Sequence, residues 1–196
     1  MDSNKKNHIN RKEAIKRTGL LLGGVVFAPN ILGVLKGCTA TPGDWTPTFF
    51  SQDQAQLVTS LADVILPADG TPAASEVGVP QFIETMVSET YSEEQQDRFL
   101  AGLDQFAGEY REELQADYFD GTDEEKYEFT YHQNQLALEA EPGGDGTPFI
   151  LMFKELTMLG YFTSEPGATE VLRYEANPGI YDGCMPLEDV GRTWAT

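Results

Sequence analysis

The chain has 196 residues, of which 40% are hydrophobic and 11% aromatic, a composition that predicts one globular domain with a hydrophobic core and excludes a disordered acidic polymer. Its formal net charge is −19 at pH 7. Because phosphate backbones and anionic lipid headgroups repel such a protein, nucleic acid binding is excluded, and contact with a membrane is expected only through a signal or a lipid anchor.

The basic residues gather at the N-terminus. Seven of the 13 Lys and Arg residues precede Cys38, with only two of the 32 acidic residues, so six basic and 30 acidic residues remain and give the rest of the chain a net charge of −24. The uncharged run TGLLLGGVVFAPNILGVL follows the basic segment, which is the order of regions in an export signal. Residues 1–38 are therefore expected to be an export signal, with an ordinary amphipathic helix as the alternative.

The segment NRKEAIK resembles the twin-arginine export motif. Arg11 and Lys12 stand at its two basic positions, with Lys12 in place of the second arginine, Ile15 at an apolar position and Lys16 at the final lysine. Glycines and a proline interrupt the apolar run, which favours this route over a permanent membrane span, and a general secretory signal is the alternative. LKGC at 35–38 resembles a lipobox, so Cys38 is either a lipidation candidate or an unmodified signal cysteine.

Residues 39–50 are expected to be a linker, and residues 51–196 a helical domain. Capping boxes begin at Ser51, Ser92 and Thr122, and Pro80 and Pro148 each predict a further helix start. Apolar residues recur at helical spacing after each signal, for example Tyr127, Tyr131 and Leu138, and no alternating strand pattern occurs. The expected fold class is all-α: a small bundle of about five helices, preceded by a signal helix and followed by a long irregular C-terminal segment.

Candidates for chemistry are few. No Gly-x-Gly-x-x-Gly follows a strand and no Cys-x-x-Cys-His occurs, so neither a dinucleotide site nor covalent haem is expected. His132 is the one histidine after the signal, and we expect it on a helix surface or partly packed. Carboxylate pairs such as Glu93 and Glu94 are expected at solvated helix ends. We assign no catalytic, cofactor-binding or metal-binding residue.

The C-terminal segment 161–196 is rich in aromatic and turn residues. Because Tyr, Trp, Met and Arg are enriched in interface cores, we expect this segment to bind a partner, with packing against its own helices as the alternative. Cys184 is expected either to be buried and inert or to form an intermolecular disulfide. The candidate interface residues are Tyr161, Phe162, Arg173, Tyr174, Tyr181, Cys184 and Trp194.

Two stretches, ADVILPADGTPAASEVGVPQFIETMV (62–87) and FKELTMLGYFTSEPGATEVLRYEANPGIYDGC (153–184), resemble the gluconate 2-dehydrogenase subunit 3 family. The members are small subunits of periplasmic, FAD-dependent sugar and polyol dehydrogenases. The resemblance implies that the partner is a large FAD-binding subunit of the glucose–methanol–choline type, often accompanied by a cytochrome c that carries haem c. It also implies that the small subunit carries the folded complex through the twin-arginine export machinery.

The resemblance therefore predicts a non-catalytic accessory subunit that stabilises and co-exports a flavoprotein. Its location is expected to be the periplasm or the periplasmic face of a membrane. This chain itself is expected to bind no cofactor, with FAD in the partner subunit. The alternatives are an independent enzyme that uses buried carboxylates and a lipid-anchored periplasmic module that binds saccharides.

Overall fold

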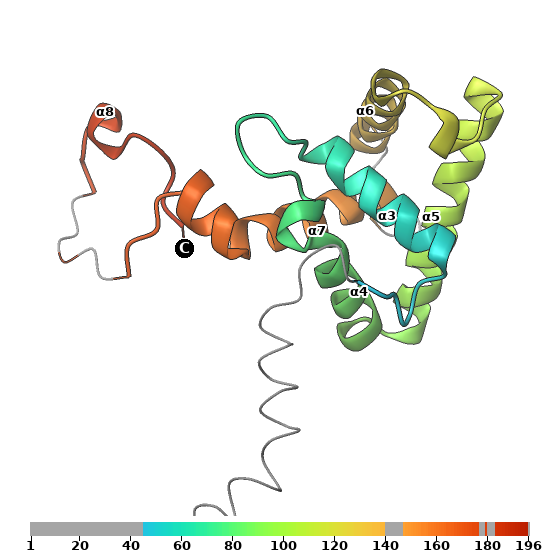
Figure 1. Ribbon diagram of the computed structural model, residues 1–196, viewed down its shortest axis with the longest axis horizontal. Helices are drawn as coiled ribbons and strands as arrows, with labels where there is room; N and C mark the ends of the chain where they lie inside the picture. The colour runs from blue at the N-terminus through green and yellow to red at the C-terminus, as the bar shows by residue number, and fades with distance from the viewer. Residues whose placement is uncertain (1–44, 140–146, 177–178, 180–182, 196) are drawn as a thin grey trace, which may run out of the picture. The chain divides into compact units, whose positions relative to one another are not determined.

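The computed structural model describes residues 45–139, 147–176, 179 and 183–195 (Figure 1). The predictions on the export motif (Arg11, Lys12, Ile15 and Lys16), on Cys38 and on Tyr181 lie outside these residues.

The described residues are mostly helical and contain no β-strand, which confirms the all-α class and the expected number of about five helices. The long helices are α3 (Gln52–Ile65), α4 (Val79–Thr90), α5 (Glu93–Leu114), α6 (Asp123–Glu139) and α7 (Phe149–Thr163). There are also four short helical elements of one or two turns in the described residues: η2 (Ser75–Val77), η3 (Tyr118–Asp120), η4 (Gly167–Val171) and α8 (Leu187–Val190). None of the helices in the described part of the chain is long and apolar enough to cross a membrane.

The three predicted capping boxes are confirmed. The hydroxyl of Ser51 accepts a hydrogen bond from the Gln54 amide at 3.2 Å, and the Gln54 side chain accepts one from the Ser51 amide at 3.1 Å. Ser92 makes the equivalent pair at the start of α5, and Thr122 makes it before α6. Each box satisfies backbone N–H groups that have no partner inside the helix, so these starts are determined locally by four residues.

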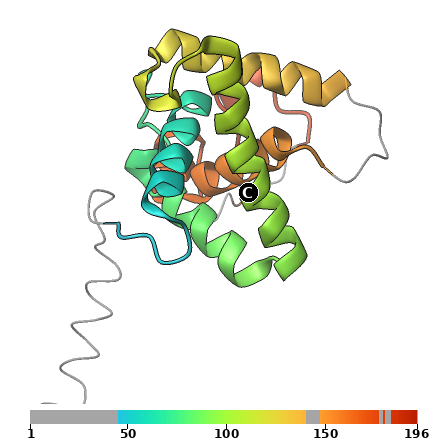
Figure 2. The same ribbon diagram turned by 90° about the vertical axis from the view of Figure 1, so that its right-hand side faces the viewer.

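Helix α7 lies in the middle of the bundle, where it packs against α3, α4, α5 and α6 (Figures 1 and 2). Its Phe153 is fully buried and stacks on the fully buried Phe99 of α5, with ring centroids 6.3 Å apart. Phe50 also stacks on Phe99, with ring centroids 6.0 Å apart. Each of these rings contributes about 2–3 kcal/mol through burial, so the core depends on aromatic packing between the two ends of the domain sequence.

One predicted boundary is corrected. Residues 45–50 are not a linker, because Phe50 is only 4% exposed and belongs to the core. The glycine near the end of helix α7 has a packing role. Gly160 lies against the ring of Phe82 on α4, where a Cβ atom would come within 2.6 Å of the ring, so the glycine permits close packing of the two helices.

Two glycines of α5 differ in their surroundings and give opposite expectations. A Cβ atom at Gly102 would lie 2.6 Å from Cβ of Phe149, whereas at Gly108 it would meet nothing within 4 Å. Gly102→Ala is therefore expected to destabilise the domain by about 1–3 kcal/mol through overpacking. Gly108→Ala is expected to stabilise it by about 0.5–1 kcal/mol through helix propensity. Urea unfolding of both variants beside the parent chain measures the two effects, and a change of the same sign would contradict the packing described here.

Candidate functional site

The segment before α3 is held by one carboxylate of α4. Glu84, only 6% exposed, accepts hydrogen bonds through Oε1 from the backbone amides of Thr48 and Phe49 at 2.7 Å and of Phe50 at 3.1 Å. Its Oε2 accepts a bond from Nε1 of Trp45 at 2.9 Å. The four donors come from six consecutive residues, so a single side chain fixes the course of residues 45–50.

The environment of Glu84 favours its charged form. Burial by itself raises the pKa of this carboxyl, but the hydrogen bonds from the amides of residues 48–50 and from the indole of Trp45 outweigh burial, so the pKa lies below its ordinary value. At neutral pH the group is an ionised carboxylate with both oxygens occupied. It is therefore a structural anion that is already fully used, and we do not assign it to proton transfer.

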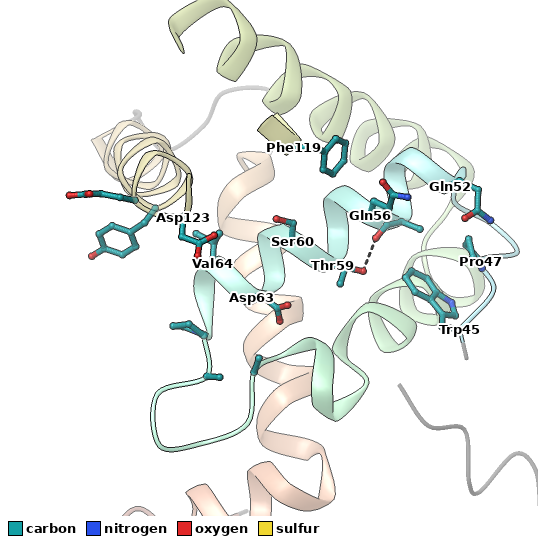
Figure 3. A pocket seen from close by; sticks show the side chains of 16 residues that line it. Trp45, Pro47, Gln52, Gln56, Thr59, Ser60, Asp63, Val64, Phe119 and Asp123 are labelled. Atoms are coloured by element: carbon teal, nitrogen blue, oxygen red, sulfur yellow. Dashed lines mark hydrogen bonds between the residues drawn. The ribbon is translucent and has the colours of Figure 1, made fainter. Parts of the chain in front are cut away.

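Beside this anchor runs a groove with a volume of about 990 Å³, which we call the α3 groove. Trp45 and Pro47 lie at one end, Asp123 lies toward the other, and side chains of α3 such as Thr59 and Asp63 lie between them (Figure 3). Small apolar residues and prolines line much of it. These are Pro47, Ala55, Val64, Pro67, Ala68 and Ala73.

Three aromatic residues from separate segments line the α3 groove: Trp45, Phe119 and Tyr127. Phe119 is 45% exposed although it belongs to the one-turn helix η3. Asp117 fixes this turn, because its Oδ1 accepts the Phe119 amide at 3.1 Å and its Oδ2 pairs with Arg111 at 3.0 Å. The turn therefore presents a large apolar ring to solvent at a defined place.

The apolar residues that recur at helical spacing along α6 are exposed. Tyr127 is 54%, Tyr131 51% and Leu138 59% exposed, and the first two stack with ring centroids 6.2 Å apart. The buried residues of α6 are instead Phe129 and Thr130. A regular apolar spacing shows that one face of a helix is apolar, but not whether the same domain covers it.

The structure separates the candidate interface residues of the C-terminal segment. Tyr161 is corrected to a core residue, because it is 2% exposed and its hydroxyl donates to the carbonyl of Pro72 at 2.7 Å. Phe162 is half-buried beside it. Tyr174 is 59% exposed, and Cys184 is also exposed. Their contact with a partner stays a prediction.

Two further candidates, Arg173 and Trp194, contact each other and so join the two ends of the C-terminal segment. The guanidinium of Arg173 lies 4.1 Å from the centre of the Trp194 ring, a cation–π contact. The amide of Arg173 donates to the carbonyl of Thr193 at 2.8 Å, and that of Ala195 donates to the carbonyl of Arg173 at 2.9 Å. The segment from 173 to 195 is thus closed into a loop by its own ends.

His132 lies exposed on α6, as expected. Within the described ranges, no three His, Cys, Asp or Glu side chains come together in an arrangement that could hold a metal ion.

The fold and the groove define a small all-α protein with a preformed, largely apolar surface groove. The family model of gluconate 2-dehydrogenase subunit 3 matches residues 52–179, and the chain belongs to this family. No curated protein and no solved structure matches the chain at a significant level. The matched range includes α3, η3 and α6, and so all of the groove except Trp45 and Pro47.

Replacing the anchoring carboxylate tests its structural role. Glu84→Gln is expected to lower the free energy of unfolding at pH 7 by about 2–4 kcal/mol, since a neutral amide accepts weaker hydrogen bonds and turns an NH₂ group toward one set of donors. Glu89→Gln on the exposed side of the same helix is the matched control, with an expected change below about 0.5 kcal/mol. Urea unfolding of both variants measures the difference.

The effect of Glu84→Gln on the free energy of unfolding is also expected to depend on pH. Because the pKa of Glu84 is lower in the folded chain, its contribution is present above the ordinary value of 4.5 and is lost as the pH falls through the folded pKa. The difference in the free energy of unfolding between the parent chain and Glu84→Gln should therefore be largest at neutral pH. It should decrease as the pH falls below that value. A difference that does not decrease in acid would contradict a lowered pKa.

Loss of the cation–π contact should loosen the C-terminal loop. Arg173→Ala is expected to raise the hydrogen-exchange rate of the Ala195 amide by roughly 2–10-fold, the range that corresponds to the energy of an exposed to partly buried cation–π pair. Arg98→Ala serves as the control, because it removes a surface arginine of α5 whose guanidinium lies 3.8 Å from the carboxylate of Glu94. Equal exchange at Ala195 in both variants would show that the backbone bonds alone close the loop.

Proposed function

We propose that this chain is a non-catalytic accessory subunit of a membrane-associated, FAD-dependent sugar or alcohol dehydrogenase. The observation that carries the proposal is the family match over residues 52–179, since the family is named for a dehydrogenase subunit. In this assignment the large partner subunit, of the glucose–methanol–choline type, holds the FAD and performs the oxidation. A cytochrome c with haem c is the third member of the complex.

The chemistry of the described residues supports an accessory role. The most deeply buried carboxylate, Glu84, accepts four hydrogen bonds from its own chain, which makes it a poor candidate for proton transfer. Large apolar side chains are nevertheless exposed on η3 and α6, where a partner would remove them from water. These are Phe119, Tyr127, Tyr131 and Leu138.

The second part of the proposal is co-export. The motif at Arg11, Lys12, Ile15 and Lys16 directs the chain to the twin-arginine machinery, and the flavoprotein crosses the membrane folded and bound to it. Lipidation of Cys38 then tethers the complex at the periplasmic face. Such a tether is needed because a body with a net charge of −24 has no electrostatic attraction to anionic lipids.

Purification of the tagged chain from its native host tests the assignment. We expect a large chain in stoichiometric amount, a flavin absorbance spectrum and recovery of both chains from the periplasmic fraction. Deletion of the gene for the small chain should leave the flavoprotein in the cytoplasm, because the export signal is then lost. An untagged strain controls for nonspecific capture.

A lone, colourless protein would contradict the proposal. In that case saccharide binding becomes the preferred hypothesis. Calorimetric titration of the purified chain with oligosaccharides then tests whether it binds them. Turnover of a sugar or alcohol by the isolated chain would instead support an independent enzyme.

A further inference from the structure

We propose that the α3 groove is the docking site for a cationic, apolar segment of the large flavoprotein subunit. This inference rests on the proposed function, and it places the central contact on α3, η3 and α6 rather than on the C-terminal loop. The groove has a volume of about 990 Å³ and a largely apolar lining, and it adjoins the exposed aromatic face of α6 at Tyr127.

The groove lining selects for apolar side chains between its polar groups. Ala55, Val64 and Ala68 supply small aliphatic surfaces, and two of the nearby polar groups are already occupied within the domain. The hydroxyl of Thr59 donates to the carbonyl of Ala55 at 2.8 Å. The carboxylate of Asp63 accepts the amide and the hydroxyl of Ser75, each at 2.8 Å. Such a surface removes the aliphatic side chains of a partner from water.

The charge of the groove selects for a cation. Asp63, Asp123 and Glu124 line it, and no Lys or Arg occurs among the described lining residues. The neighbouring Glu125 is occupied by the capping box with Thr122, whereas Asp123 and Glu124 face the groove as exposed residues of the first turn of α6. Carboxylates beside aromatic rings attract Lys and Arg both by ion pairing and by cation–π contact.

The groove is also preformed, which lowers the cost of binding. Trp45 is fixed at one end by its hydrogen bond to Glu84, and Phe119 is fixed by the turn that Asp117 caps. Their rings therefore lose little freedom when a partner arrives, and rigid aromatic anchors of this kind account for most of the binding energy at protein interfaces. A segment with Lys or Arg residues flanked by aliphatic ones fits both the lining and the charge.

Two pairs of substitutions test the apolar and the charged parts separately. Phe119→Ala with Tyr127→Ala should weaken binding of the purified flavoprotein subunit to the full chain by about tenfold or more, as measured by biolayer interferometry. Asp123→Asn with Glu124→Gln should weaken binding at low salt. In this variant the affinity should also decrease less between about 50 mM and about 500 mM NaCl than in the parent chain, since fewer charge pairs are available for salt to screen.

Each pair has a matched control in the same fold. Leu136→Ala removes an apolar side chain that is 49% exposed on the same helix and lines a different hollow. Glu93→Gln with Glu94→Gln neutralises two carboxylates in the first turn of α5 and so matches the loss of helix-dipole stabilisation at α6. Both controls should keep the parental affinity and salt dependence, and circular dichroism confirms that all variants are folded.

The outcomes separate this inference from the proposed function. If the parent chain binds no flavoprotein, the proposed function fails. If the parent chain binds it and the groove variants bind equally well with the same salt dependence, the docking inference alone is overturned, and the C-terminal loop becomes the next candidate surface.

A photo-reactive amino acid in place of Phe119, activated in the assembled complex, identifies the occupant directly. We expect a cross-link to a stretch of the flavoprotein that contains Lys or Arg among apolar residues. A cross-link to a second copy, within the chain itself, or to a stretch without basic residues would overturn the inference. So would specific oligosaccharide binding that the flavoprotein does not displace.

Discussion

The arrangement of the domain depends on one carboxylate that is satisfied entirely by its own chain. Glu84 accepts hydrogen bonds from three backbone amides and an indole of residues 45–50. This segment places Phe50 in the aromatic core and leads directly to Ser51, the N-cap of α3. The same contact holds Trp45 at the end of the α3 groove. Core packing, a helix start and the shape of the surface groove are thereby coupled through a single buried anion.

Much of the helical architecture follows from local chemistry, which explains why the sequence predicts it. A capping box such as that at Ser92 needs only four consecutive residues, and Pro67 ends a helix without help from the rest of the fold. The Glu84 anchor has no such local signature, because its donors lie 34 to 39 residues earlier in the chain. The Pro- and Thr-containing segment before α3 therefore has the composition of a linker although it is packed.

The candidate site was harder to predict, because the number of aromatic residues in a segment does not determine their exposure. The C-terminal segment is dense in aromatic residues, yet Tyr161 is buried and Trp194 contacts Arg173. The three aromatic residues of the groove, Trp45, Phe119 and Tyr127, come from separate segments of the sequence, and only the fold brings them together. Helical spacing did place Tyr127 and Tyr131 on one face of α6, but spacing alone could not show that this face remains uncovered.

The acidic residues illustrate how the fold divides one residue type between two roles. Glu84 and Asp63 have their oxygens occupied by donors of the same domain, so these carboxylates serve stability. Asp123 and Glu124 are exposed beside apolar surface, where their charge can act on another molecule. A chain with so large an excess of acids gains solubility before assembly, but the same excess rejects any partner that lacks a complementary cation. In the proposed complex the acidic groove would therefore provide selectivity as well as binding energy, because an apolar partner without basic residues would leave these carboxylates desolvated and unpaired.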